Sequence, residues 1–238
     1  MILFYIRHGD PIYNPDSLTE LGKRQAEAVA KRLALYGIDR IYASTSNRAM
    51  QTAKSTGELT KKEIELLDFC NEGYAWKEFT VLDESEKRQW VFHNIEWMQL
   101  FMSREMRQMG ENWYEHPKCS AYNFWQGINR INRATDAFLL SLGYEHIREQ
   151  GIYRAVNPSE ERVALFAHQG FGISFLSSLL DIPYPQFCVH FDMTHTGMTV
   201  IEFKEHDGVA IPKVLTMSND SHIYREGLPL RYNNGLQF

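Results

Sequence analysis

The first residues along the chain that could take part in a reaction are Arg7, His8 and Gly9, which follow an apolar run at residues 1–6. The guanidinium of Arg7 is a planar fork of donors that suits a phosphate or a carboxylate, and the ring of His8 can act as a base or a nucleophile. Gly9 lets an anion approach the backbone closely. Because a tripeptide of this kind also occurs in ordinary polar loops, its meaning depends on partners elsewhere in the chain.

Arg48, Glu72 and His168 are the best candidates for those partners. Each comes shortly after a run of residues that is predicted to form a strand. Because ligands bind beyond the carboxyl ends of strands in open α/β sheets, we expect these side chains to meet Arg7 and His8 at one edge of a sheet. Two histidines, two arginines and a carboxylate suit phosphoryl transfer, since guanidinium groups match the dispersed negative charge of a phosphoryl group. The sequence therefore indicates a phosphoryl-transfer site assembled from separate segments.

The elements that must position these residues alternate between strands and helices. Strand-like runs lie at residues 1–6, 40–43, 63–67, 162–167, 197–203 and 210–216. Helices are predicted from Thr19, as N-cap, to about Tyr36, from near Arg48, over about 122–142, and after His168 as far as Asp181. This alternation predicts an α/β protein of three α/β/α layers with a mostly parallel central sheet.

Residues 74 to about 121 differ in character from the rest of the chain. They are rich in Glu, Lys, Arg, Met and aromatic residues, mostly helical in period, and contain no convincing strand. We therefore expect a helical cap inserted into a single domain of residues 1–238. The five tryptophans of the chain all fall between Trp76 and Trp125. Aromatic side chains on helices more often form core, but such a concentration could also line a substrate cavity.

The composition is that of an ordinary globular protein. The 238 residues, of which 44% are hydrophobic and 23% charged, suffice for one large α/β domain. A formal net charge of −5 disfavours extended contact with nucleic acid or with an anionic membrane, since both need a basic face. No apolar run approaches the roughly 20 residues of a membrane span, and the N-terminal run lacks the features of a signal peptide. We therefore expect a cytoplasmic protein.

Metal and redox sites have little support in the sequence. The chain contains three cysteines, Cys70, Cys119 and Cys188. Their odd number and wide separation argue against disulfides and against a Cys-x-x-Cys site. Other possible ligands lie near the C-terminus, at His190, Asp192, His195 and His206. Their spacing matches no recognised ligand pattern, so we expect no cofactor and no metal.

Several short motifs follow one another along the chain. They are Arg7-His8-Gly9 with Asn14, Leu18-Thr19-Glu20-Leu21-Gly22 with Gln25-Ala26, Ser44 through Arg48 to Ala53, Glu72-Gly73, and His168. Together they resemble the histidine phosphatase superfamily, the phosphoglycerate-mutase-like group, in its first branch. The matching pieces cover residues 1–73 and about 162–222, whereas the insertion resembles no family that we can name. Each motif alone is weak, but five in register are strong.

The resemblance implies a role for each matching residue. His8 matches the phosphate-accepting nucleophile of the family, and Arg7 and Arg48 match its phosphate clamps. His168 matches the second histidine beside the transferred group. Glu72 lies where members of the first branch carry the general acid and base.

Other positions extend the resemblance or depart from it. Asn14 matches a frequent additional phosphate contact, and the backbone at Gln169, which begins a predicted helix, is placed to donate to phosphate. Pro11 stands where threonine is common, which removes a hydroxyl and a backbone donor. Gln169 stands where many members have glycine. Gly73-Tyr74 replaces a longer basic and aromatic signature of phosphoglycerate mutases, which favours a phosphatase.

The sequence thus predicts a metal-independent phosphatase that acts on a phosphate monoester of a small metabolite through a phosphohistidine on His8, with Glu72 as general acid and base. Two alternatives remain open: a phosphomutase of the same family and a non-catalytic module that binds a phosphorylated ligand. Other carboxylates near Glu72 could serve as the acid, namely Asp68, Glu78, Asp83 and Glu84. We expect a small phosphorylated partner, no nucleic acid and no membrane. The sequence predicts neither the substrate nor the oligomeric state.

Overall fold

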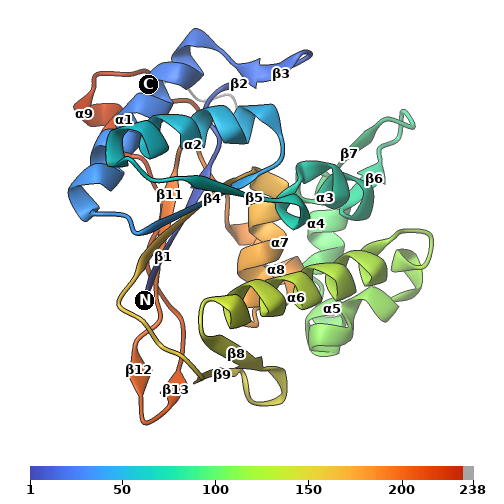
Figure 1. Cartoon of the computed structure of the whole chain (residues 1–238). Coiled ribbons are helices and arrows are strands. Elements are labelled where there is room, and N and C mark those ends of the chain that lie inside the picture. The colour runs from blue at the N-terminus through green and yellow to red at the C-terminus, as the bar shows by residue number, and fades with distance from the viewer. Residues whose placement is uncertain (233–238) are drawn as a thin grey trace.

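A six-stranded sheet forms the centre of the computed structural model, which describes residues 1–232 (Figure 1). The neighbouring parallel strands are β5 (Ile64–Leu67), β4 (Arg40–Ser44), β10 (Arg162–Ala167) and β1 (Ile2–Arg7). Beside β1 the antiparallel strands β11 (Met198–Glu202) and β14 (Lys213–Asn219) complete the sheet. The predicted mostly parallel sheet is confirmed. Residues 233–238, the end of the tail that we expected to be irregular, lie outside the described residues.

Strand β1 lies between β10 and β11, and both of its faces are buried. Leu3 and Tyr5 belong to the apolar core on one side of the sheet, whereas Phe4 and Ile6 belong to the core on the other side. A strand covered on both faces needs a continuous apolar run, which is what the N-terminal residues supply. The carboxyl end of β1, where Arg7 and His8 follow, is therefore anchored in the middle of the sheet.

Helices cover both faces of this sheet (Figure 1). One face carries α1 (Glu20–Tyr36) and α2 (Asn47–Thr60), and α9 (Ser221–Arg225) packs on α1. The other face carries α6 (Phe124–Ser141) and α7 (Gln169–Leu180), with α8 (Tyr184–His190) packed on α7. The predicted arrangement of three α/β/α layers is confirmed.

The ends of α1 show how local sequence sets the element boundaries. The side chain of Thr19 accepts a hydrogen bond from the amide of Gly22 at 3.0 Å, as an N-cap residue does. Gly37 ends the helix with a φ of 73°, a left-handed conformation that glycine adopts without steric cost. Both boundaries agree with the sequence prediction. Helix α7 likewise ends at Asp181, as predicted.

The inserted segment contains a short hairpin as well as helices. Its elements are α3 (Glu72–Glu78), β6 (Thr80–Leu82), β7 (Arg88–Trp90), α4 (Ile95–Phe101), α5 (Arg104–Met109), and 3₁₀ turns at Val91–His93, Gly110–Glu115 and Pro117–Cys119. The expectation that this segment has no strands is therefore wrong. Thr80 and Val81 favour extended backbone, and the carboxylate of Asp83 closes the turn by accepting from the amides of Ser85 and Lys87.

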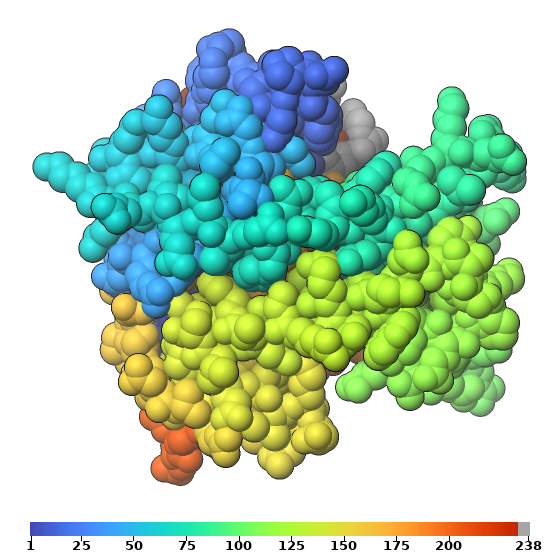
Figure 2. Space-filling model, turned by 45° about the vertical axis from the view of Figure 1, so that its right-hand side comes forward, coloured from blue at the N-terminus to red at the C-terminus, as the bar shows by residue number. Residues whose placement is uncertain are grey.

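The insertion shares one apolar core with the α6 to α8 layer. Phe79, Phe101 and Trp113 all contact the ring of Tyr184 in α8, and they belong to the same buried cluster as Leu165 of β10. In Figure 2 the green surface of the insertion runs on without a break into the yellow-green surface of α6. A single domain over residues 1–238 with a cap over about 74–121 stays a prediction.

Several short elements were not predicted. Residues 10–17, expected to be a loop, include the hairpin of β2 (Pro11–Tyr13) and β3 (Asp16–Leu18), and a 3₁₀ turn at Asp68–Cys70 follows β5. A second sheet contains β8 (Tyr144–Ile147), β9 (Ile152–Ala155), β12 (Glu205–His206) and β13 (Val209–Ala210), with a 3₁₀ turn at Arg148–Gln150. Helices α8 and α9 were missed as well. Such short elements depend on tertiary pairing more than on local periodicity. Within residues 1–232 no helix is both long and apolar enough to cross a membrane.

Candidate active site

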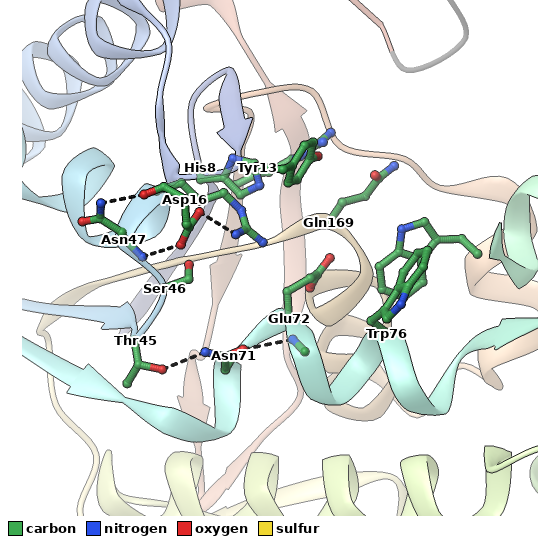
Figure 3. A pocket seen from close by; sticks show the side chains of 14 residues that line it. His8, Tyr13, Asp16, Thr45, Ser46, Asn47, Asn71, Glu72, Trp76 and Gln169 are labelled. Atoms are coloured by element: carbon green, nitrogen blue, oxygen red, sulfur yellow. Dashed lines mark hydrogen bonds and ion pairs between the residues drawn. The ribbon is translucent and has the colours of Figure 1, made fainter. Parts of the chain in front are cut away.

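A cavity of about 730 Å³ lies at the carboxyl ends of the parallel strands (Figure 3). Its walls come from the segments that follow β1, β4, β5 and β10, together with the β2–β3 hairpin and β7. The lining residues are Arg7, His8, Tyr13, Asp16, Thr45, Ser46, Asn47, Arg48, Asn71, Glu72, Gly73, Trp76, Trp90 and Gln169. Residues that are distant in sequence thus meet at one edge of the sheet, as ligand-binding residues of open α/β sheets do.

His8 is buried, and its ring is oriented by the backbone next to it. Nδ1 lies 2.7 Å from the carbonyl oxygen of Gly9, so Nδ1–H donates this bond and Nε2 carries the lone pair of the neutral ring. Burial lowers the pKa of His8 well below its ordinary 6.5, and His168 and the two arginines lower it further. A neutral imidazole with a free lone pair on Nε2 can act as a nucleophile.

Close packing fixes the backbone at Gly9. Its amide donates to Oγ1 of Thr52 at 3.0 Å, and that hydroxyl donates to the carbonyl of Arg48 at 2.8 Å. A Cβ atom at Gly9 would lie 2.6 Å from the carbonyl oxygen of Gly22. Only glycine fits this approach to α1, so α1 and α2 together hold the turn that carries His8.

Arg7 and Arg48 bring two guanidinium groups to the cavity. Arg7 is buried and donates to the carbonyl of Met193 at 2.6 Å. Arg48 pairs with Asp16 at 2.8 Å, and its guanidinium lies 5.5 Å from the centre of the Tyr13 ring. Nε of Arg48 is buried and has no hydrogen-bond partner within the described part of the chain. Two such groups can hold the non-bridging oxygens of a phosphoryl group.

Glu72 is the first residue of α3. The helix begins here because the side chain of Asn71 caps it by accepting from the amide of Gly73 at 3.0 Å. The two carboxylate oxygens of Glu72 accept hydrogen bonds from the amides of Gly170 and Phe171, each at 2.9 Å. Glu72 is therefore fixed to the N-terminus of α7.

Burial raises the pKa of Glu72, although its two backbone hydrogen bonds and the charges of Arg48 and Arg7 oppose the shift. A carboxyl group with a raised pKa is better able to hold a proton and to act as a general acid. The alternative acids considered above are Asp68, Glu78, Asp83 and Glu84. In the described part of the chain none of them lines the cavity. Glu78, for example, is paired with Arg130 at 2.6 Å.

His168 lies beside His8 at the end of β10, although it is not among the described residues that line the cavity. Its Nε2 lies 2.9 Å from Oγ of Ser44 and 3.1 Å from Oγ of Ser46. Its Nδ1 is buried and has no hydrogen-bond partner among residues 1–232. Burial lowers the pKa of His168 well below 6.5, and the charges of the two arginines lower it further. If a serine hydroxyl donates to Nε2 of the neutral ring, Nδ1 carries the proton and can donate to a ligand.

The two other predicted binding residues are placed differently. Gln169 lines the cavity, and its side-chain amide donates to Asp192. Asn14 is exposed at the turn between β2 and β3 and is not among the lining residues. Pro11, which departs from the family pattern, pairs with Leu18 at the start of that hairpin. A phosphate contact from Asn14 stays a prediction.

The sequence gave no direct signal for several lining residues, notably Tyr13, Asp16, Trp76 and Trp90. Tyr13 and Asp16 reach the cavity through a hairpin that was not predicted. Trp76 and Trp90 belong to the concentration of tryptophans, the one sequence signal that suggested a cavity wall. Trp113, by contrast, is a core residue, because its side chain is fully buried.

The possible metal ligands near the C-terminus do not come together. Among residues 1–232 no group of three or more His, Cys, Asp or Glu side chains could hold a metal ion. His195 instead packs near His8, with ring centroids 5.7 Å apart, and its Nδ1 lies 3.6 Å from a carboxylate oxygen of Asp10. Burial and the charges of Arg7 and Arg231 lower the pKa of His195 to about 2.

A three-layer α/β/α fold with two histidines, two arginines and a carboxyl group at the ends of its strands agrees with the arrangement implied by the sequence resemblance. Residues 3–117 match the family model described as histidine phosphatase superfamily (branch 1). The matching region contains Arg7, His8, Arg48 and Glu72 and spans just under half of the chain. A search of curated protein sequences finds no match.

Solved structures share the fold along nearly the whole chain. A mutant phosphoserine phosphatase from Entamoeba histolytica in complex with phosphoserine has 18% sequence identity and a TM-score of 0.59, covering 93% of this chain and 98% of the other. A phosphoserine phosphatase of the same organism in complex with 3-phosphoglyceric acid has 22% identity and a TM-score of 0.58, with the same coverage. A mycobacterial glucosyl-3-phosphoglycerate phosphatase has 17% identity and a TM-score of 0.57, covering 91% and 98%. These similarities establish the fold.

Proposed function

We propose that this protein is a phosphatase that hydrolyses a phosphate monoester of a small metabolite through a covalent phosphohistidine on His8. One observation carries the proposal. The hydrogen bond from Nδ1 of His8 to the Gly9 carbonyl leaves the lone pair on Nε2, in a cavity that Arg7 and Arg48 also line. The match of residues 3–117 to the histidine phosphatase model supports the same reaction class, and so do the phosphatases that share the fold.

In the first step, the lone pair on Nε2 of His8 attacks phosphorus in line, and the bond between phosphorus and the ester oxygen breaks. Glu72 transfers its proton to the departing alkoxide, so that the product leaves as an alcohol. The raised pKa of Glu72 favours the protonated form that this step requires. Arg7 and Arg48 stabilise the negative charge on the non-bridging oxygens.

In the second step, the Glu72 carboxylate removes a proton from water, and the water oxygen attacks the phosphorus of phosphohistidine. The bond between phosphorus and Nε2 breaks, and its electron pair returns to the ring of His8. Inorganic phosphate leaves, which restores neutral His8 and protonated Glu72. Nδ1 of His168 donates to a phosphoryl oxygen in both steps, because Ser44 and Ser46 lie at its other ring nitrogen.

Phosphate release from simple alkyl phosphates, measured for the native protein and for His8→Ala, tests this proposal. We expect the native protein to release phosphate and to form an acid-labile phosphoenzyme after rapid quenching, and we expect His8→Ala to do neither. Normal turnover by His8→Ala would refute the role of His8. A long-lived phosphoenzyme that yields an isomerised product, without release of phosphate, would identify a phosphomutase instead.

A further inference from the structure

The cavity offers few cations to a substrate. Among the described residues that line it, the only fixed positive charges are those of Arg7 and Arg48, and the carboxyl groups are those of Asp16 and Glu72. Arg48 is already paired with Asp16 at 2.8 Å. Once the two guanidinium groups hold a phosphoryl group, a second anionic group of the substrate would lie near the Asp16 carboxylate and the Glu72 carboxyl group, and the described lining residues would supply no further cation. Such an arrangement is unfavourable.

Two arginines on neighbouring elements, Arg88 and Arg130, have other partners. Arg88 of β7 donates to the hydroxyl of Thr80 at 2.9 Å. Arg130 of α6 forms two hydrogen bonds of 2.6 Å with the carboxylate of Glu78. Neither arginine lines the cavity. The described residues that line the cavity therefore supply no third cation that could compensate a carboxylate or a second phosphate in the organic part of the substrate.

Two tryptophans form an aromatic wall of the cavity. The rings of Trp76 and Trp90 are nearly perpendicular, with centroids 5.0 Å apart. Trp90 is stacked on Phe92 at 5.4 Å and packs so tightly on the start of α7 that a Cβ atom at Gly170 would lie 2.3 Å from it. Trp90 is thus held rigidly, and Trp76, which is 37% exposed, keeps apolar surface available to a ligand.

This wall lies on the leaving-group side of the site. In Figure 3, Glu72 lies between His8 and Trp76. Because the nucleophile and the leaving oxygen occupy opposite sides of phosphorus in an in-line displacement, the group that receives a proton from Glu72 points toward Trp76. The other lining residues near Glu72 are uncharged, notably Asn71 and Gln169. They can bond to neutral polar substituents.

We infer that the organic part of the substrate is a flat, uncharged aromatic or heteroaromatic ring that packs against Trp76 and Trp90. The inference rests on the proposed function, because it assigns the phosphate to the arginines. A cavity of about 730 Å³ has room for a phosphate and such a ring. The protein accordingly discriminates against small carboxylate-bearing esters such as phosphoserine and 3-phosphoglyceric acid.

Benzyl phosphate, ethyl phosphate and O-phosphoserine test this inference, because all three release an alkyl alcohol and differ mainly in the ring of the first and in the carboxylate and ammonium groups of the last. We expect kcat/KM for benzyl phosphate to exceed kcat/KM for ethyl phosphate by about tenfold, which is what one well-packed aromatic ring allows. The excess over kcat/KM for O-phosphoserine should be larger. An O-phosphoserine value equal to or above that of benzyl phosphate would overturn the inference.

Matched tryptophan variants assign the preference to the wall. Trp125 serves as the control, because it is 52% exposed and does not line this cavity. The ratio of kcat/KM for benzyl phosphate to that for ethyl phosphate should fall about tenfold in Trp76→Ala and stay unchanged in Trp125→Ala. An unchanged ratio in Trp76→Ala would remove Trp76 from the ring site.

Binding to His8→Ala separates this inference from the proposed function. Calorimetric titration with benzyl phosphate and O-phosphoserine measures the preference without turnover. Suppose that the native protein hydrolyses none of the esters, but that His8→Ala binds benzyl phosphate at least about tenfold more tightly than O-phosphoserine. The proposed reaction then fails and the ring site stands. If the native protein hydrolyses the esters but His8→Ala binds O-phosphoserine as tightly as benzyl phosphate, the ring site fails and the reaction stands.

Discussion

The imidazole rings of His8 and His168 lie edge to face, with centroids 5.2 Å apart and planes at 61°. Burial lowers the pKa of both histidines well below 6.5, and the two arginines lower both further. Two neutral rings can contact one phosphoryl group without repelling each other, whereas two imidazolium ions at this distance would repel strongly. This agrees with the proposed mechanism, in which one ring attacks phosphorus while the other donates to a phosphoryl oxygen.

Replacement of His168 by asparagine should lower kcat on an alkyl phosphate by about a hundredfold, the usual cost of one donor aimed at developing charge. The fold should persist, since asparagine is smaller and polar. Phosphate release and the circular dichroism spectrum check both expectations. His206→Asn is the matched control, because His206 is exposed on β12. Equal activity of the two variants would contradict a role for His168.

Arg7→Lys and Arg48→Lys should each lower kcat/KM by about a hundredfold and weaken inhibition by inorganic phosphate. Lysine keeps the charge but loses the planar fork that holds two phosphoryl oxygens. Arg24→Lys is the control, because Arg24 is exposed on α1. Steady-state kinetics with phosphate as competitive inhibitor measure both effects. Inhibition constants that match the native value in both cavity variants would show that phosphate binds elsewhere.

Much of the fold could be predicted because its main elements follow local rules. The run before Arg7 is apolar on both faces as a central parallel strand requires, and Thr19 and Gly37 bound α1 as expected. The β6–β7 hairpin could not be foreseen, because three-residue strands carry too little periodicity to be separated from a helical background. Its position depends on packing of Trp90 against the start of α7.

The site was predictable to the extent that motifs stood at strand ends. Arg7, His8 and Arg48 could be grouped because the carboxyl ends of parallel strands share one edge of a sheet. The hydrogen bonds that hold Glu72 could not be inferred, since they join α3 to backbone amides far along the chain. Asp16 was missed because its contact with Arg48 depends on the β2–β3 hairpin.

Glu72 should give activity a pH dependence that varies with the leaving group. Burial raises the pKa of Glu72, so the protonated acid persists to higher pH than in an exposed glutamate and is lost as the pH rises through that value. For a benzyl or ethyl phosphate, kcat should therefore fall on the alkaline side. The leaving group of 4-nitrophenyl phosphate needs no proton. For this ester, the rate of the first step should therefore not fall at alkaline pH.

The variant Glu72→Gln should lose about a hundredfold in kcat on alkyl phosphates, and it should lose much less in phosphoenzyme formation from 4-nitrophenyl phosphate. Glu84→Gln is the control, because Glu84 is exposed in the turn between β6 and β7. Single-turnover experiments isolate the first step for each ester. A loss of the same size on both esters would mean that Glu72 positions α7 and does not transfer a proton.

His146 should make the stability of the fold depend on pH away from the active site. Its Nδ1 lies 3.0 Å from Asp136 and its Nε2 lies 2.8 Å from Asp181, so both carboxylates can accept from an imidazolium. Burial lowers the pKa of His146, but these hydrogen bonds outweigh burial and raise the pKa above 6.5. A raised pKa in the folded state means stabilisation that is complete below the unfolded pKa and is lost as the pH rises through the folded value.

The difference in Tm between the native protein and His146→Gln should therefore be largest near about pH 5.5 and should shrink by about pH 9. Glutamine retains a polar side chain but cannot become charged, so it removes only the titrating part of the interaction. The buried His8, His168 and His195 have lowered pKa values and act in the opposite direction, since they destabilise the fold as the pH falls. Their contribution is common to both proteins and cancels in the difference. A difference that grows with pH would show that His146 is neutral in the folded protein.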